Sequence, residues 1–169
     1  EFTQLDLEMS FIEREDIMEL NEKLLIEIVT KLYPEKKIQE VPFPCLKYHD
    51  VMKERSTDRP DLRKDKDDPN LLAFCWVIDF PFFEKTDPSA GSGQAWTFTH
   101  NPFSRPIPDH MDWLMKKENI GDIITTQYDV ILNGLEIGGG SIRNHQSKAL
   151  QKVFEIMGFE KDRIKKNFG

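Results

Sequence analysis

The chain has 169 residues, is 38% hydrophobic and carries a formal net charge of −7 at neutral pH. This length is that of one domain, and the acidic charge argues against a surface that binds nucleic acid non-specifically. Neither a signal peptide nor an apolar run long enough to cross a membrane is visible, and Cys45 and Cys75 do not indicate a disulfide framework. We therefore expect a cytoplasmic protein that does not enter a membrane.

The first half of the chain alternates between regular elements and proline-rich connections. Residues 2–11 alternate between apolar and polar side chains, which predicts an amphipathic strand. Apolar residues recur at helical spacing over 15–32 (Ile17, Leu20, Leu24, Ile28, Leu32), and Tyr33-Pro34 ends the predicted helix. A short helix is expected near 48–55, and residues 71–80 are typical of a buried strand.

The second half begins with a predicted turn or loop over 86–94, which contains Pro88, Gly91 and Gly93. A short helix is expected over 109–118 and a hairpin over 128–143. A last helix should begin at Ser147 as its N-cap and end at Gly158. Basic residues near 161–166 fit a solvated helix face. Together these elements predict an α+β fold, an antiparallel β-sheet flanked by helices.

The segment 135–143 combines Glu136, the three successive glycines 138–140 and Arg143. Consecutive glycines cost backbone entropy in a strand, so they indicate that a ligand or another backbone comes close. Arg143 can grip a carboxylate or a phosphate with two hydrogen bonds. Taken alone, the pattern fits a glycine-rich turn with a surface ion pair about as well as it fits a binding site.

The residues before this segment favour the binding site. An apolar run ends in Asn133-Gly134, a strong signal for a two-residue hairpin turn. Such a turn would pair Ile131 with Glu136 and Asp129 with Gly138, so both carboxylates would share one sheet face. Two carboxylates beside side-chain-free backbone suit Mg²⁺ that carries a polyphosphate. Strict alternation would send Arg143 to the other face, and we expect a bulge in the glycine run to bring it back.

Five segments, in order along the chain, resemble the catalytic domain of a class II aminoacyl-tRNA synthetase of the bacterial aspartyl type. They are residues 1–11, which look like the second half of motif 2, then 57–63, 76–84, 100–103 and 127–143. The resemblance implies that residues 1–169 form part of a class II catalytic domain. It also implies ATP-dependent activation of aspartate to aspartyl-adenylate, followed by transfer to the tRNA 3′ end.

The resemblance also implies that parts of the family pattern lie outside this chain. Motif 1, the first strand of motif 2 and motif 3 would flank it, and the chain alone is expected to be inactive. The family usually has a large insertion domain where this chain has only the polar segment 64–70. We expect a compact form with a short linker there. The parent protein would be a homodimer that binds tRNA mainly through another domain.

The resemblance assigns roles to individual residues. Asp129 and Glu136 would hold Mg²⁺, and Gln4 and Glu136 would lie by the ATP. Arg143 would pair with the side-chain carboxylate of the substrate aspartate.

The substrate amino acid would have three further contacts. Asp6 would anchor its ammonium group, directly or through water. His100 would contact it from a loop that closes over the substrate. Asn101 stands where the bacterial pattern usually has a second histidine; it can hydrogen-bond a carboxylate but carries no charge.

Two alternatives stay open at the level of sequence. One is a related class II enzyme, an asparaginyl-tRNA synthetase or an asparagine synthetase of that fold, although Arg143 and residues 58–61 favour aspartate. The other is a non-catalytic module that binds an amino acid or a nucleotide.

Overall fold

The computed structural model describes residues 1–86, 95–160, 162, 164 and 166. Apart from Thr86, the predicted loop at 86–94 lies outside the described residues, as do Lys161, Arg163 and Lys165 of the basic cluster. The helices and strands follow one another along the chain in this order: α1 (Arg14–Leu32), β1 (Lys37–Ile38), β2 (Cys45–Lys47), α2 (Tyr48–Arg55), β3 (Leu71–Leu72), β4 (Phe74–Ile78), β5 (Phe83–Lys85), β6 (Trp96–Phe98), the 3-10 turn η2 (Pro108–His110), α3 (Met111–Lys116), the 3-10 turn η3 (Ile120–Asp122), β7 (Tyr128–Leu132), β8 (Leu135–Gly140) and α4 (Ser147–Ile156).

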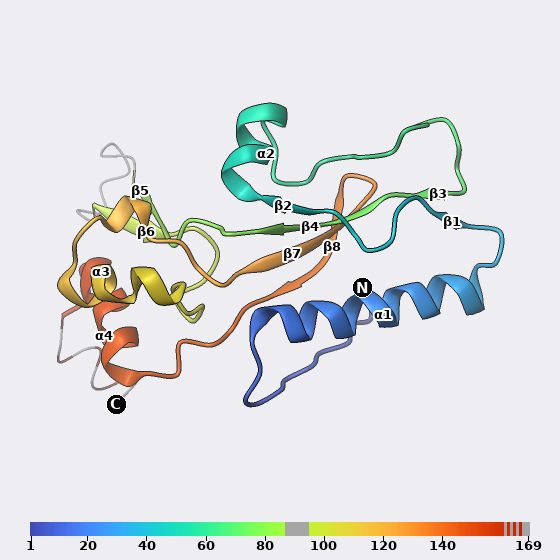
Figure 1. Cartoon of the computed structure of the whole chain (residues 1–169). Helices are drawn as coiled ribbons and strands as arrows, with labels where there is room; N and C mark the ends of the chain where they lie inside the picture. Colours follow the sequence, from blue (N-terminus) through green and yellow to red (C-terminus); the bar gives the residue numbers. More distant parts are fainter. Residues whose placement is uncertain (87–94, 161, 163, 165, 167–169) are drawn as a thin grey trace.

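A four-stranded sheet in the order β2-β4-β7-β8 forms the centre of the molecule (Figure 1). β4, β7 and β8 are antiparallel neighbours, whereas β2 runs parallel to β4. Two smaller sheets pair β1 with β3 and β5 with β6. The expected α+β fold is confirmed, but the expectation of a wholly antiparallel sheet is wrong for β2, because α2 and a long connection separate β2 from β4 and allow a parallel pairing.

The helix α1 packs against one face of this sheet (Figure 1). The predicted helix is confirmed, and it begins one residue earlier than expected. Its buried stripe differs from the predicted one: Ile17 and Val29 are buried, whereas Leu20 and Leu32 are exposed. The stripe is displaced because the helix presents Ile17, Met18, Leu25, Ile26 and Val29 to the aromatic side chains of the sheet.

The two faces of the sheet carry different side chains. Trp76 pairs with Val130, and both pack towards α1. Val77 pairs with Asp129, and this pair points to the opposite face, where Phe80 completes a second apolar cluster. Asp129 is thus a buried acid on the face of the sheet that α1 leaves uncovered.

The predicted strand 71–80 is divided into two strands at Ala73. The side chain of Asn133 accepts a hydrogen bond from the Ala73 N–H at 2.8 Å and donates one to the Leu71 carbonyl at 3.0 Å. β3 therefore joins β1 while β4 joins the central sheet. At the other end, Asp79 has a positive φ of 62°, which ends the extended conformation.

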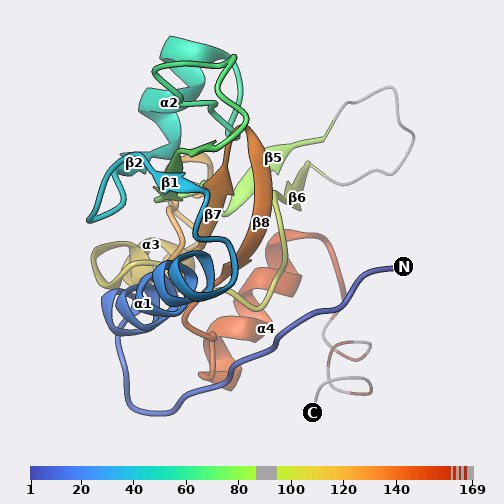
Figure 2. The same cartoon turned by 90° about the vertical axis from the view of Figure 1, so that its right-hand side faces the viewer.

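The prediction of a strand over 2–11 is wrong. Among the described residues this segment pairs with no strand, and its apolar side chains, from Phe2 to Phe11, are exposed. An extended segment becomes a strand only when a neighbour takes its backbone hydrogen bonds. Figures 1 and 2 show the segment running below α1 to the start of that helix, without joining the sheet.

The short helices and α4 pack at one end of the sheet around Phe82, Leu114 and Val153 (Figure 1). The predicted helix at 109–118 consists of η2 followed by α3. The last helix starts at Ser147 as expected, but its N-cap is Gln146, and Ser147 makes no capping hydrogen bond. Gly158 follows the helix with φ 82°. In the part of the chain that the structure describes, no helix is both long and apolar enough to cross a membrane.

The β7–β8 hairpin turns at Asn133 and Gly134, which both have positive φ, 52° and 85°. Leu132 pairs with Leu135 across this turn, and the predicted pairing of Ile131 with Glu136 is confirmed. The predicted pairing of Asp129 with Gly138 is wrong, since Asp129 pairs with Gly139 and Val130 pairs with Gly138. The expected bulge exists, but it lies at Ile137, just before the glycines.

The glycines make room for the chain's own side chains. A Cβ on Gly139 would collide with the Asp129 carboxylate, and a Cβ on Gly140 would lie 2.5 Å from the Tyr128 hydroxyl. A Cβ on Gly138 would meet Val130 at an ordinary distance of 3.4 Å. The glycine run predicted that a ligand or another chain segment comes close to it. Two side chains of β7, Asp129 and Tyr128, do so.

We expect Gly140→Ala to destabilise the fold by about 1–3 kcal/mol, because the buried Tyr128 ring must move to admit a methyl group. Urea unfolding followed by tryptophan fluorescence measures the change. Gly138→Ala is the matched control and should cost much less. Equal losses in the two variants would contradict the packing explanation.

Candidate active site

The bulge at Ile137 sets which residues of β8 share the face of Asp129. Glu136 pairs with Ile131, which shares a face with Asp129, and beyond the bulge Gly139 pairs with Asp129. Past the end of β8, Ser141 Oγ lies 2.9 Å from Ser104 Oγ, and Arg143 forms an isolated bridge with Ser104. That Arg143 faces the same side as Asp129 stays a prediction.

Asp129 is the buried acid of this site, with 3% of its surface exposed. Gln127 donates a hydrogen bond from Nε2 to Asp129 Oδ1 at 3.0 Å, and His100 Nε2 lies 3.9 Å from Oδ2. Burial raises the pKa of Asp129 to about 7; the hydrogen bond from Gln127 opposes this rise, and the charges of Glu136 and Asp58 add to it. The structure therefore holds a carboxyl that titrates near neutrality.

His100 and Asn101 lie on a tight turn beside this acid. The His100 ring packs edge-on against Phe80, with the ring centroids 4.7 Å apart. Asn101 Oδ1 accepts hydrogen bonds from the N–H groups of Phe103 and Ser104, both at 2.9 Å. The side-chain oxygen of Asn101 thus stabilises the turn. A contact between Asn101 and a substrate stays a prediction.

Arg143 is exposed and follows the end of β8 by three residues. Its Nη2 donates to Glu8 Oε1 at 3.0 Å, and both side chains are largely solvated. This pair joins the N-terminal segment to the end of the hairpin. An exposed ion pair contributes about 0–1 kcal/mol, so Arg143 can exchange Glu8 for another carboxylate at small cost.

The other predicted site residues are exposed. Gln4 and Asp6 are exposed on the N-terminal segment, and no contact described in the structure ties either to Asp129 or Arg143. Glu136 is exposed on β8. The structure thus brings His100, Asp129 and the hairpin together, and positions for Gln4 and Asp6 beside them stay a prediction.

Asp129 and Glu136 provide two carboxylates on one face. Across the described ranges, no three His, Cys, Asp or Glu side chains gather as a metal site. Two carboxylates nevertheless fit Mg²⁺, which is usually held by one or two of them and takes its other ligands from water and phosphate. The donor set therefore suits a magnesium ion delivered with a polyphosphate.

Sequence reasoning missed a buried polar chain behind Asp129. Ser104 Oγ lies 3.3 Å from Gln127 Oε1, 2.9 Å from Ser141 Oγ and 3.2 Å from Asn101 Oδ1. Gln127 was within reach of sequence analysis, since it stands two residues before Asp129 and alternation puts it on the same face. The serines were not, because only the tertiary fold brings residues 104 and 141 together.

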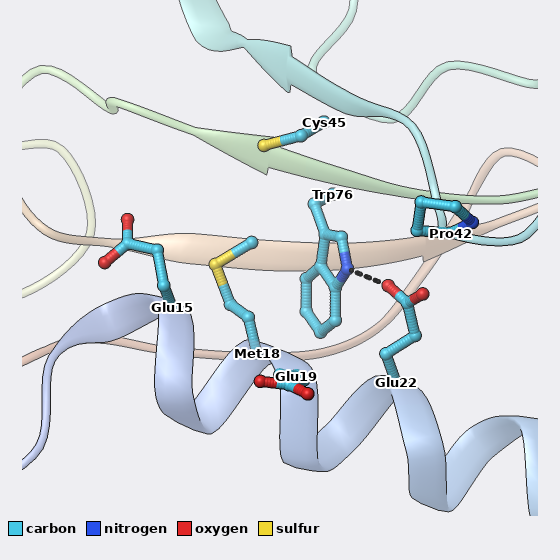
Figure 3. Close-up of a pocket in the computed structure, with 7 residues that line it drawn as sticks. All are labelled: Glu15, Met18, Glu19, Glu22, Pro42, Cys45 and Trp76. Atoms are coloured by element: carbon cyan, nitrogen blue, oxygen red, sulfur yellow. Dashed lines mark hydrogen bonds between the residues drawn. The ribbon is translucent and has the colours of Figure 1, made fainter.

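A cleft of about 330 Å³ lies on the other face of the sheet, between α1 and β4 (Figure 3). Its glutamates already have partners: Glu22 accepts hydrogen bonds from Trp76 Nε1 and from the Phe43 N–H, both at 3.1 Å, and Glu15 pairs with Arg14 at 3.0 Å. Because Trp76 faces away from Asp129, this cleft is separate from the site described above.

Comparison with known proteins identifies the family of this chain. The family described as "tRNA synthetases class II (D, K and N)" matches residues 1–169, and the chain belongs to that family. Two solved structures from Entamoeba histolytica share the fold over 94% of this chain: an aspartyl tRNA synthetase (TM-score 0.55, 18% identity, 33% of that chain) and an asparaginyl-tRNA synthetase in complex with asparaginyl-adenylate (TM-score 0.52, 16% identity, 38% of that chain).

The relatives that match this chain have a name narrower than that of the family. The "Aspartate--tRNA(Asp/Asn) ligase" of Pelagibacter ubique is 39% identical over 128 residues, which are 75% of this chain and 20% of that protein. The protein of the same name from Mycolicibacterium smegmatis is 41% identical over 113 residues, 63% of this chain and 19% of its own length. The chain thus spans about a fifth of the length of these relatives.

The buried acid gives a pH dependence of stability. Since the folded pKa of Asp129, about 7, lies above the ordinary value of 3.8, the folded state binds more protons between these values. The unfolding free energy therefore falls as pH rises from 4 to 7, by up to about 1.4 kcal/mol per unit. We expect Asp129→Asn to remove this slope and to be more stable than the wild type at pH 8 by about 2–4 kcal/mol.

Urea unfolding at a series of pH values measures this effect. Asp112→Asn on α3 is the control, because that carboxylate is exposed and should leave the slope unchanged. If the Asp129→Asn variant keeps the wild-type slope, Asp129 is not the group that titrates.

Proposed function

We propose that this chain is part of an aspartate–tRNA ligase, which activates aspartate with ATP and transfers it to the 3′ end of tRNA. The observation that carries the proposal is the bulged hairpin, in which Asp129 and Glu136 share one face and which ends three residues before Arg143. Membership of the class II family and the names of the similar proteins support it. The same reasoning extends to a cytoplasmic homodimer that binds tRNA mainly through other domains.

The proposed substrate site uses charges of both signs. Arg143 binds the side-chain carboxylate of aspartate in place of Glu8, and Asp6 faces its ammonium group directly or through water. His100, with Asn101 beside it, lies over the amino acid. Pairing of Arg143 with the substrate carboxylate separates aspartate from asparagine by charge, which shape alone cannot do.

ATP lies by Gln4 and Glu136 in this proposal, and Asp129 and Glu136 hold Mg²⁺. When bound there, the ion would neutralise charge on the ATP phosphates. The aspartate α-carboxylate attacks the α-phosphate and expels pyrophosphate, and the resulting adenylate passes aspartate to the tRNA. The residues of this chain act by orienting the substrates and by balancing charge, and no protein nucleophile takes part.

The short segment 64–70 replaces the usual insertion domain in this proposal. It is closed by local hydrogen bonds, from the Asp67 N–H to Asp65 and from the Asn70 N–H to Asp68, at 2.9 and 2.8 Å. A relative from Chlorobium chlorochromatii, 25% identical, aligns with this chain over 291 positions, which leaves a long stretch of that protein without a counterpart here. Both observations support a compact form.

Amino-acid-dependent exchange of pyrophosphate into ATP by the complete protein tests the assignment. We expect aspartate to support exchange, and asparagine and lysine, the other amino acids of this family, to fail. Exchange with asparagine alone would favour the asparaginyl alternative. No exchange with any amino acid would favour a non-catalytic binding module.

Replacing Arg143 tests the proposed specificity. We expect Arg143→Leu to lower kcat/KM for aspartate by roughly two to four orders of magnitude, because a substrate carboxylate that is desolvated on binding without its charged partner costs about 3–5 kcal/mol. Stability should change by less than about 1 kcal/mol, since the pair with Glu8 is exposed. Arg55→Leu, an exposed change on α2, is the matched control. Wild-type kcat/KM in Arg143→Leu would exclude the residue from the site.

A further inference from the structure

The buried polar chain behind Asp129 has no role in the reaction as proposed so far. It runs from the turn at Asn101 through Ser104 and Gln127 to the Asp129 carboxylate. Ser104 and Gln127 are buried, with 2% and 8% of their surfaces exposed. Buried polar groups are costly unless each has partners, so the geometry of such a chain is held tightly.

The direction of the hydrogen bonds fixes the Gln127 amide. Its Nε2 donates to Asp129 Oδ1, so its Oε1 faces Ser104 Oγ. The reverse orientation would place an oxygen against a carboxylate and leave the bond unmade. An amide is the neutral side chain that offers a donor on one side and an acceptor on the other, which this position requires.

Ser104 has more acceptors than its single hydroxyl hydrogen can serve. It donates to Gln127, Asn101 or Ser141 at any moment, and Ser141 can donate back to it. The Ser104 hydroxyl therefore keeps a partner when Gln127 is replaced. A change at Gln127 can thus remove the bond to Asp129 without leaving a buried hydroxyl unpaired.

The Asp129 carboxylate is held through Oδ1. This oxygen lies over the backbone of Gly139 and accepts from Gln127, whereas Oδ2 lies 3.9 Å from His100 Nε2, beyond hydrogen-bond distance. Rotation of the carboxylate would break the bond from Gln127 or drive an oxygen into the β8 backbone. The side of Asp129 that remains for a cation is therefore set by Gln127.

We propose that Gln127 is a positioning residue that fixes the Asp129 carboxylate for a divalent cation, and that Ser104 acts on the carboxylate through Gln127. The inference rests on the proposed function, in which Asp129 and Glu136 hold Mg²⁺. Groups that hydrogen-bond a metal ligand typically change metal affinity by about 10–100-fold when removed.

Binding of Mn²⁺ to the complete protein in the presence of ATP tests the inference, with free Mn²⁺ measured by electron paramagnetic resonance. Gln127→Met keeps the length and packing of the side chain but cannot donate a hydrogen bond. We expect it to weaken Mn²⁺ binding by about 10–100-fold and to raise the Mg²⁺ concentration for half-maximal exchange, with the KM for aspartate unchanged. Gln151→Met on α4 is the matched control and should behave as wild type.

Ser104→Ala tests the second half of the inference. On its own it should weaken Mn²⁺ binding less than Gln127→Met does, and it should add nothing in the Gln127→Met background. Equal and additive losses would show that Ser104 acts independently of Gln127 and would overturn that half.

The outcomes separate this inference from the proposed function. Wild-type Mn²⁺ affinity in Gln127→Met, or no Mn²⁺ binding by the wild-type protein with ATP, overturns the role of Gln127. Weakened binding in the variant supports it even if aspartate fails to drive exchange, a result that would overturn only the assignment of the amino-acid substrate.

Discussion

The close packing of β7 on β8 is the constraint on which the rest of the site depends. Asp129 and Tyr128 lie over the backbone of Gly139 and Gly140, where no side chain larger than hydrogen fits. The bulge at Ile137 sets which glycine meets which residue, and therefore which face the end of β8 presents. Without it, Gly138 rather than Gly139 would lie opposite Asp129. One extra residue in a strand thus decides which part of β8 Asp129 packs against.

The two charged residues of the site differ in what they contribute to stability. Asp129 is buried with a neutral hydrogen-bond donor as its nearest partner, so its ionised form is disfavoured in the folded protein. Arg143 is solvated, and its pair with Glu8 contributes little to stability. In the proposed function, a cation would supply a charged partner for Asp129, and a substrate carboxylate would replace Glu8 at Arg143. Such an arrangement is typical of sites that give up stability in exchange for function.

The turn that carries His100 and Asn101 shows how a local departure from a family pattern can be accommodated. Asn101 does not need to carry charge in order to hold this loop, because its side-chain oxygen closes the turn through the backbone of Phe103 and Ser104. Asparagine favours such turns through this type of bond. The loop therefore remains next to Asp129, linked to it by Ser104 and Gln127.

The sequence alone determined the local features: the helix α1, the positive-φ turn at Asn133-Gly134, the pairing of Ile131 with Glu136, and the common face of Asp129 and Glu136. These depend on periodicity and on neighbours in the chain. The tertiary structure decided the position of the bulge, the division of residues 71–80 at Ala73 and the failure of residues 2–11 to form a strand. It also decided the contact of Ser104 with Gln127. Each of these depends on a partner far away in sequence, because a backbone or a buried polar group takes its hydrogen bonds wherever the fold supplies them.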